Sequence, residues 1–391
     1  MCNLSQMYRR LASLAIGAVL VFSSPAVAQH FTRLGDATGG EASWIKLVRQ
    51  GNLLVTGVRD GAGRIKLIAW QPDQAGNLTR RGDVTGPEVR GGFDMIALGA
   101  ASDGTYGRSI ITAAVDTSGN LLLNRWFVSD DGQTVELRAS GAAGEVSSLS
   151  LVPIRDNRPY FATAVRDGAG NLKLIEWGRV TTNDPTTGIV RREDVSAGAV
   201  TFLAAAGDAA LPAGSFLQTG QVVTALRDSA NRLRLIEWEF PPGPSNNIRR
   251  GATATAGEVL GVDVLWTGPN RYVTSVQDAD GNLKLILWSL GPDGFTRLDD
   301  ASAGQVFLPI DAIKVGSHVI TGVQDGSGNL RLIAWAEGAT SLTRRRDIGA
   351  GAIQSSSISM APLGLARLAV AVIDAARNLK VIVYQFDQPP L

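Results

Sequence analysis

One sequence pattern occurs seven times along this chain of 391 residues. Its plainest copy runs from Val165 to Trp177 and reads Val-Arg-Asp-Gly-Ala-Gly-Asn-Leu-Lys-Leu-Ile-Glu-Trp. Every copy places an aspartate ten residues before an aromatic residue, and successive aspartates lie 47 to 61 residues apart. A period of this size is typical of repeat proteins, in which each small unit buries its apolar faces against its neighbours. The seven pairs are Asp60–Trp70, Asp116–Trp126, Asp167–Trp177, Asp228–Trp238, Asp278–Trp288, Asp325–Trp335 and Asp374–Tyr384.

Each unit contains four short runs that favour β-strands. In the unit of Asp167 these runs are 146–152, 160–165, 172–177 and 189–192, and Gly, Asp, Asn or Pro lies between them. The second and third runs are joined by Asp-Gly-x-Gly-Asn, which is typical of a tight hairpin turn. No segment after the N-terminal region has a sustained helical period with caps. We therefore predict an all-β fold, a seven-bladed β-propeller with four antiparallel strands per blade.

The two ends of the chain predict how the ring closes. The fourth run of the unit, Thr-Arg-x-Gly-Asp, already occurs at 32–36, before any complete unit, whereas the last unit ends after its third run at Tyr384. We expect the N-terminal strand near Phe31–Leu34 to complete the last blade, which would pair both free edges. The alternative is an open β-solenoid, which gives no reason for a divided first and last unit.

The first 28 residues have the features of a signal peptide. Arg9 and Arg10 precede an apolar stretch of 12 residues, Leu11 to Phe22, which is short for a membrane span. Residues 23–28 end in the small-x-small pattern that signal peptidase accepts. The sequence thus predicts a signal peptide over 1–28, a single propeller domain over 29–391, and a secreted or periplasmic location. An uncleaved anchor is the alternative.

Composition narrows the classes of function. Lys and Arg number 37 and Asp and Glu 36, so no basic excess points to a nucleic-acid partner. The single cysteine, Cys2, precedes the apolar stretch, which leaves the mature chain without thiols. The two histidines are too few for a three-histidine zinc site. We expect no cofactor, no metal, no membrane partner after cleavage, no identifiable catalytic residue, and a monomer.

We predict that the repeated residues have structural roles. The repeated Trp could stack on a sugar or base, but seven equivalent aromatics more simply pack one blade on the next. The repeated Asp could belong to a calcium loop, as in Asp278-Ala-Asp280-Gly-Asn282, but most copies lack the second carboxylate, so we favour turn chemistry. The paired Arg of the fourth run is read as structural.

The two repeated loops should lie on one face of the disc. These are the hairpin turn and a segment Ala-Gly-Glu-Val between the fourth run and the next first run, which would give that face rings of carboxylates. The other face would carry the irregular loops.

Residues that interrupt the repeat are the better candidates for a binding site. Trp266, Arg271 and Tyr272 cluster around one irregular loop, and we predict that they form a ligand-contact patch. The other interrupting residues are Trp44, Tyr106, Arg108, Arg155, Arg158, Tyr160 and His318.

The repeat unit resembles units of secreted bacterial seven-bladed β-propeller proteins of uncharacterised function, over nearly all of residues 31–386. More loosely it is similar to propeller lectins, which implies a sugar site between adjacent blades but carries over no site residue. Three hypotheses follow: a binding protein for carbohydrate or another extracellular polymer, a scaffold for an extracellular protein partner, and a glycan-acting enzyme with acids such as Glu145 and Glu258 at a central funnel.

Overall fold

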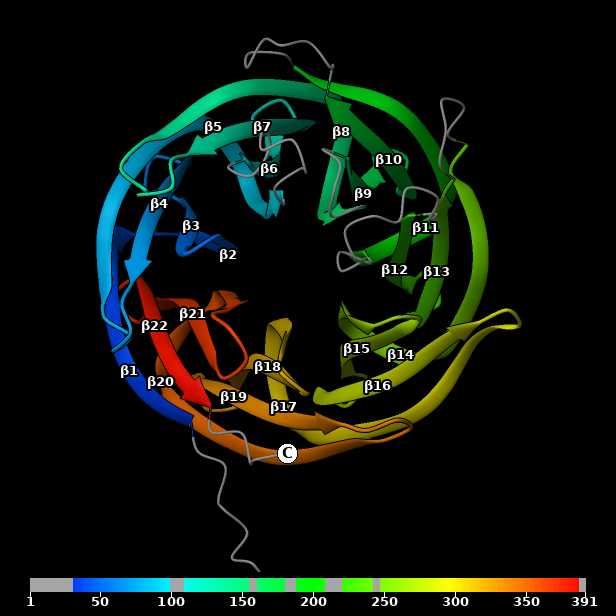
Figure 1. Cartoon of the computed structure of the whole chain (residues 1–391). Helices are drawn as coiled ribbons and strands as arrows, with labels where there is room; N and C mark the ends of the chain where they lie inside the picture. Colours follow the sequence, from blue (N-terminus) through cyan, green and yellow to red (C-terminus); the bar gives the residue numbers. More distant parts are fainter. Residues whose placement is uncertain are drawn as a thin grey trace, which may run out of the picture.

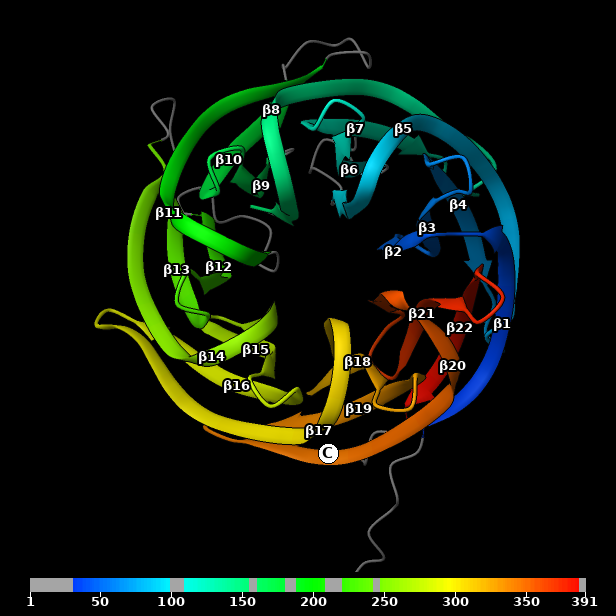
Figure 2. The same ribbon diagram turned by 180° about the vertical axis from the view of Figure 1, so that it is seen from behind.

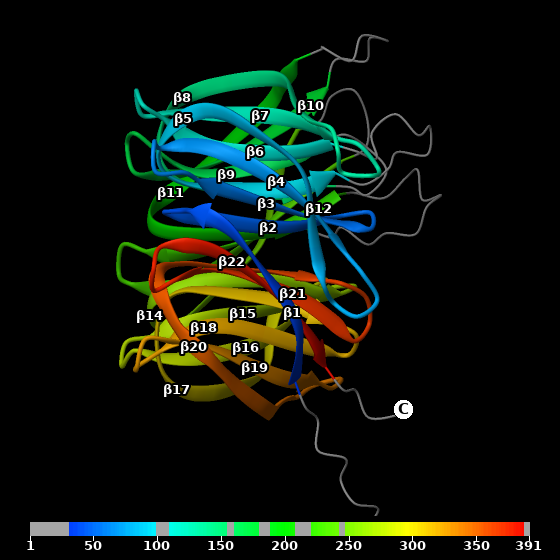
Figure 3. The ribbon, with the colours of Figure 1, turned by 90° about the vertical axis from the view of Figure 1, so that its left-hand side faces the viewer.

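The computed structural model describes residues 31–98, 109–154, 160–179, 188–207, 220–241 and 247–386, and over these residues the chain is all β-strand and turn. The strands stand around a central axis and form a ring, the arrangement of a β-propeller (Figure 1). The view from behind shows the same ring (Figure 2), and the edge-on view shows a thick disc (Figure 3). Within the described residues, no helix is long and apolar enough to span a membrane.

Two kinds of strand make up the ring. Six long strands each run from the outer edge to the axis: β5 (Leu78–Leu98), β8 (Val135–Pro153), β11 (Ile189–Gly207), β14 (Arg249–Gly268), β17 (Gly294–Val315) and β20 (Leu342–Pro362). The others are short: β1 (Phe31–Glu41), β2 (Trp44–Gln50), β3 (Leu53–Arg59), β4 (Arg64–Pro72), β6 (Ser109–Asp116), β7 (Asn120–Val128), β9 (Phe161–Asp167), β10 (Asn171–Arg179), β12 (Gly220–Asp228), β13 (Arg232–Phe240), β15 (Arg271–Asp278), β16 (Asn282–Gly291), β18 (His318–Asp325), β19 (Asn329–Glu337), β21 (Arg367–Asp374) and β22 (Asn378–Phe386).

Each long strand belongs to two units of the repeat. The first half of β5 pairs with β4, and its second half pairs with β6 after a register shift between Val89 and Phe93. The segment around Glu88, expected to be a loop, is therefore bulged strand that pairs with Arg64 beside the hairpin turn. Because the long strands continue from unit to unit, the described strands form one sheet of 22 strands instead of separate four-stranded sheets.

The first strand pairs with the last, as the divided repeat predicts. β1 is antiparallel to β22, with Phe31 opposite Phe386, Arg33 opposite Tyr384 and Glu41 opposite Asn378. The chain then passes Ala42 and Ser43 and enters β2. The pairing gives β22 a strand on each side and leaves β1 as the outermost strand of the last unit.

The repeated aspartate is a turn residue in every copy. Its Oδ1 accepts the backbone N–H groups of the residues two and four positions later, over 2.8 to 3.1 Å, as Asp167 does from Ala169 and Asn171. These bonds fix the tight hairpin between the second and third strands of each unit. Turn chemistry, rather than calcium binding, accounts for the repeated aspartate.

The repeated tryptophan is a packing residue. All six are 0 to 3 % exposed, and each indole N–H donates to a threonine hydroxyl of the adjacent strand over 2.9 to 3.0 Å. Tyr384 takes the seventh position and is equally buried. These rings fill the space between neighbouring units and are closed to ligands.

The outer rim carries a repeated set of ions. On the outer halves of four long strands, β5, β11, β17 and β20, and on β1, an arginine pairs with an aspartate three residues later. A cation of the adjacent strand reaches the same carboxylate, as Lys66 does at Asp83 over 3.0 Å. The predicted structural role of these arginines is confirmed. The pairs are Arg33–Asp36, Arg80–Asp83, Arg191–Asp194, Arg297–Asp300 and Arg344–Asp347.

Candidate functional site

The seven strand segments nearest the axis each place one side chain at an equivalent position. In six of the seven units this residue is polar and lies between two apolar residues, as in Ile310-Asp311-Ala312-Ile313. Each of the seven residues lies opposite a Gly, Ala or Ser of the next strand, which leaves it room against the neighbouring unit. The seven are Lys46, Asp94, Ser150, Ala204, Asp263, Asp311 and Ser359.

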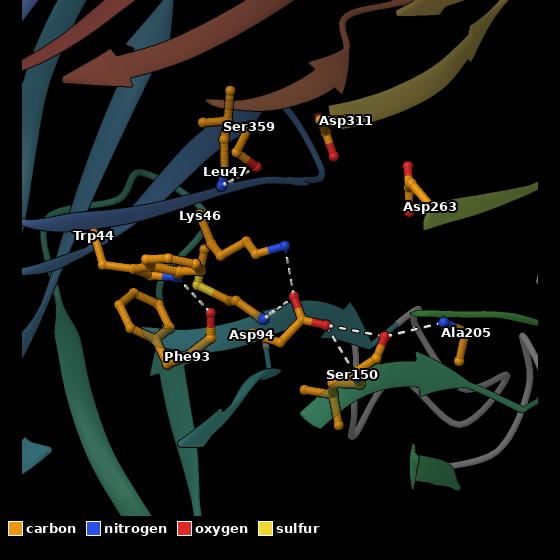
Figure 4. A network of polar contacts seen from close by, with 12 residues as sticks. Trp44, Lys46, Leu47, Phe93, Asp94, Ser150, Ala205, Asp263, Asp311 and Ser359 are labelled. Atoms are coloured by element: carbon orange, nitrogen blue, oxygen red, sulfur yellow. Dashed lines mark hydrogen bonds and ion pairs between the residues drawn. The ribbon is translucent and has the colours of Figure 1, made fainter. Parts of the chain in front are cut away.

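These residues link one unit to the next around the axis (Figure 4). In five junctions a side-chain oxygen accepts the backbone N–H of the neighbouring inner strand, and in a sixth the Lys46 ammonium lies 3.1 Å from Oδ1 of Asp94. At the seventh, Ala204 has no polar side chain. We call the six contacts the axial belt. Its five hydrogen bonds are Asp94–Leu151 (2.8 Å), Ser150–Ala205 (3.2 Å), Asp263–Ala312 (3.1 Å), Asp311–Met360 (2.6 Å) and Ser359–Leu47 (2.9 Å).

The charges at the axis perturb one another. Burial raises the pKa of Asp263 to about 8, and the nearby Asp311 adds to this effect while Lys46 opposes it. Burial also raises the pKa of Asp311 to about 6, against the attraction of Lys46. Burial alone would lower the pKa of Lys46, but the carboxylates of Asp94, Asp311 and Asp263 more than offset it and the pKa is raised. The lysine is thus held charged, and the axis retains a proton at neutral pH.

A pocket of about 360 Å³ opens at the axis beside the belt, on the face that carries the hairpin turns. Lys46, Asp94 and Asp263 lie on its lining together with the rings of Trp44 and Phe202. We call it the axial pocket. It falls in the size range of small-molecule sites, and it combines aromatic faces with a few fixed polar groups, the composition expected of one.

The position of Trp44 in the axial pocket is fixed by its neighbours. Its indole N–H donates to the carbonyl oxygen of Phe93 over 2.8 Å (Figure 4). The ring lies over Gly92, where an added Cβ would come within 2.6 Å of it. The glycine thus makes room for the indole, and one aromatic wall of the pocket is formed before any ligand arrives.

The serines of the belt indicate what its aspartates do. Ser150 and Ser359 make the same bond to the next strand as Asp94, Asp263 and Asp311. A neutral hydroxyl suffices for that bond, so bridging the units is the shared role and the carboxylate charge is additional. Among the described residues, no group of three or more His, Cys, Asp or Glu side chains could hold a metal ion.

A second concavity, of about 610 Å³, lies between β13 and β16 near the outer edge. Here the Tyr272 hydroxyl donates to Gln221, whose amide donates to Glu237 over 2.6 Å, and Glu237 accepts the backbone N–H of Ala252. Glu239 also lies on its lining. We call this the lateral cleft. Its wall is rich in oxygen atoms but has no aromatic side chain, so it offers a ligand no stacking surface.

The structure corrects the patch predicted around Trp266, Arg271 and Tyr272. Tyr272 is 0 % exposed, because it packs between two units. The Arg271 guanidinium is bound to Glu337 over 2.9 Å and to two carbonyl oxygens of the same turn. Trp266 is half-buried opposite Tyr272. The three residues do lie together, but they join neighbouring units, and Tyr272 has no exposed surface to offer a ligand.

Among the other predicted residues that the structure describes, Trp44 lines the axial pocket and His318 and Tyr160 lie apart from it. His318 is buried edge-on against Phe386, and Tyr160 lies beneath the Arg192 guanidinium. Tyr106, Arg108, Arg155 and Arg158 lie outside the described residues.

The expectation of carboxylates at a central funnel was correct in kind but wrong in position. Glu145 and Glu258 are exposed on strands beside the hairpin turns, and neither lines the axial pocket. The acids at the axis are Asp94, Asp263 and Asp311. The available signal was a polar residue between two apolar neighbours in the first run of six units.

Comparisons with known proteins identify a likeness of shape only. No family model and no curated protein matches the chain. Among solved structures, a variant of the Aleuria aurantia lectin in complex with α-methyl-L-fucoside aligns at 12 % identity with a TM-score of 0.48, over 82 % of this chain and 98 % of the lectin. A likeness at this level transfers neither a site nor a ligand to this chain.

Proposed function

We propose that the chain is a secreted or periplasmic, non-catalytic binding protein that takes one ring of a carbohydrate in the axial pocket. The observation that carries the proposal is the meeting of Trp44, Phe202, Lys46 and Asp94 in one cavity of about 360 Å³. A sugar ring has an apolar face of C–H groups and an edge of hydroxyls. An aromatic wall suits the first, and an ammonium with carboxylates suits the second.

The polar groups in the pocket are preorganised. Lys46 is held by Asp94, and Asp94 is held in turn by the N–H of Leu151. A site whose side chains are already fixed loses less conformational entropy when a ligand binds. The non-catalytic part of the proposal is supported by the serines at equivalent positions, since a role that Ser150 and Ser359 share with the acids needs no proton transfer.

We further infer a closed ring of seven blades, formed after removal of residues 1–28. The seven equivalent hairpin turns, the seven axis-facing residues and the pairing of β1 with β22 support closure. N-terminal sequencing of the protein purified from its native host tests processing, and Gln29 is the expected first residue. A mature protein that retains Arg9 and Arg10 would contradict this part of the proposal.

Binding is tested by screening the mature protein on a glycan array and titrating the best ligand by calorimetry. Lys46→Met and Trp44→Phe should each weaken binding by about tenfold, since each removes one directed contact. Lys66→Met is the matched control, because Lys66 pairs with Asp83 on the rim, away from the pocket. A flat array, or equal losses for Lys46→Met and Lys66→Met, would refute the axial site.

One observation favours a second candidate, a protein partner. Phe307 and Leu260 are 50 % and 40 % exposed, and they occupy equivalent positions of β17 and β14 near the mouth of the pocket. Exposed apolar side chains at the same place on neighbouring units suit a protein surface. If this candidate holds, Leu260→Ser with Phe307→Ser should abolish co-purification of a defined partner and leave glycan binding unchanged.

A further inference from the structure

We propose that the axial pocket selects ligands that carry an ammonium group, such as an amino sugar, and that their binding displaces a proton from the axial carboxyl groups. The inference rests on the proposed function and deepens it by naming the class of ligand. It concerns the charge of the pocket, which the aromatic wall and the hydroxyl-binding groups do not determine.

The charges that face the axis do not balance. The seven inner strand segments contribute three carboxyl groups, one ammonium, two hydroxyls and one methyl group, from Lys46, Asp94, Ser150, Ala204, Asp263, Asp311 and Ser359. With every group ionised, the axis would hold two more negative than positive charges. The other charged side chain on the pocket lining is Arg90, which is exposed at the mouth, where water screens its charge.

In the empty pocket, a bound proton offsets part of this excess negative charge. Burial and the neighbouring Asp311 raise the pKa of Asp263 to about 8, so its carboxyl group is mostly neutral at pH 7. A bound cation beside Asp263 would favour its ionised form and thereby lower its pKa. The ligand's ammonium would then take over the role of the proton, which leaves Asp263 for the solvent, and the total charge of the pocket with its ligand equals the charge of the empty pocket.

The cavity provides two contacts that suit an ammonium group. The Asp263 carboxyl group lines the pocket, and its Oδ2 accepts the backbone N–H of Ala312 over 3.1 Å. The indole of Trp44 lines the same pocket, and the face of an indole attracts cations. A metal ion is the weaker fit, because no set of three suitable ligands meets within the described part of the chain.

Calorimetry in two buffers of different protonation enthalpy measures both the affinity and the protons released. The probes are glucosamine and glucose, which differ by one ammonium group. At pH 6.5 we expect glucosamine to bind at least about tenfold more tightly than glucose, with release of up to one proton. Its affinity should rise with pH between pH 5.5 and 7, by at most tenfold per unit, because ionised Asp263 is the form that binds the cation.

Asp263→Asn keeps an oxygen that can accept the N–H of Ala312 but removes the titrating group. In this variant we expect less proton release, a weaker pH dependence that reflects Asp311 alone, and a smaller preference for glucosamine. The matched control is Asp300→Asn, on the rim beside Arg297 and Lys284, which should behave as the wild type.

The outcomes separate the inference from the function on which it rests. Equal binding of glucose and glucosamine without proton release would overturn the inference and leave the carbohydrate site standing. Binding of neither probe, together with a flat glycan array, would remove the proposed function and the inference with it. Undiminished proton release in Asp263→Asn would show that Asp263 is not its source and would also overturn the inference.

Discussion

The axis and the rim of the disc carry the same kinds of ionic residue, but they shift the pKa values of their aspartates in opposite directions. At the rim, hydrogen bonds from Lys66 and Arg80 outweigh burial and hold the pKa of Asp83 below its usual value. At the axis, burial and Asp311 raise the pKa of Asp263. The difference lies in burial and in the ratio of charges. Asp263 is buried at the axis, where three carboxyl groups share Lys46, whereas each rim carboxylate is more exposed and meets two cations.

This contrast indicates which ions are scaffold and which are available for function. A rim aspartate with two cations is already neutralised, so it gains little from a further partner. The axial acids are incompletely neutralised, and such groups in a cleft are candidates for binding. Repetition alone did not distinguish the two, since the rim pairs recur in five units and the charged axial residues in four.

The largest expected effect is the loss of the axial cation. Lys46→Met leaves three carboxyl groups at the axis without a counter-ion and should lower the free energy of unfolding by about 2 kcal/mol. This loss of stability is smaller than the loss expected for a fully buried ion pair, because the Lys46 side chain is 29 % exposed. Urea denaturation at pH 7 measures it. Lys66→Met on the rim should cost no more than about 0.5 kcal/mol, and equal costs would contradict the contrast between axis and rim.

The pH dependence of stability should have opposite signs in the two regions. Because the pKa of Asp263 is raised to about 8 in the folded protein, the folded state holds a proton that the unfolded chain has lost, and stability falls as pH rises from about 4 to 8. Asp263→Asn should remove this fall and be more stable than the wild type at pH 8.5 by about 1 kcal/mol.

The rim variant provides the reverse test. The pKa of Asp300 is lowered by the hydrogen bonds of Lys284 and Arg297, so its contribution to stability is present at neutral pH and is lost as pH falls through the lowered value. Asp300→Asn should therefore cost more stability at pH 7 than at pH 3. Thermal unfolding of Asp263→Asn and Asp300→Asn from pH 3 to 9 tests this prediction. If stability depends on pH in the same way in both variants, the proposed difference between axis and rim is wrong.

The sequence could predict the features that repeat without variation. The aspartate and tryptophan act within one unit, through a turn and an adjacent threonine, so seven similar copies were enough to assign them. The pairing of β1 with β22 followed from the division of one unit between the chain ends. Each of these inferences depends on local chemistry or on counting.

The axial site could not be found in this way. Its seven positions hold lysine, aspartate, serine and alanine, and variable loops separate them from the repeated aspartates, so neither identity nor spacing marks them. The ligand-contact patch predicted at Arg271 and Tyr272 failed for the opposite reason. They interrupt the repeat because they join two neighbouring units, and the contacts that use them, with Glu337 and Gln221, lie 66 and 51 residues away.

The smallest expected effect concerns single bonds of the axial belt. Ser359→Ala removes the acceptor for the N–H of Leu47 and should cost about 1 kcal/mol of the free energy of unfolding. Ala204→Ser makes the reverse change at the one junction without a polar side chain, where Val264 is the residue equivalent to Leu47, and should add up to about 0.5 kcal/mol. Neither change alters the charge, so both effects should be independent of pH between 5 and 9, unlike that of Asp263→Asn. If Ala204→Ser destabilises the protein instead, the seventh junction has no room for a bridging hydroxyl, and the belt is complete with six contacts.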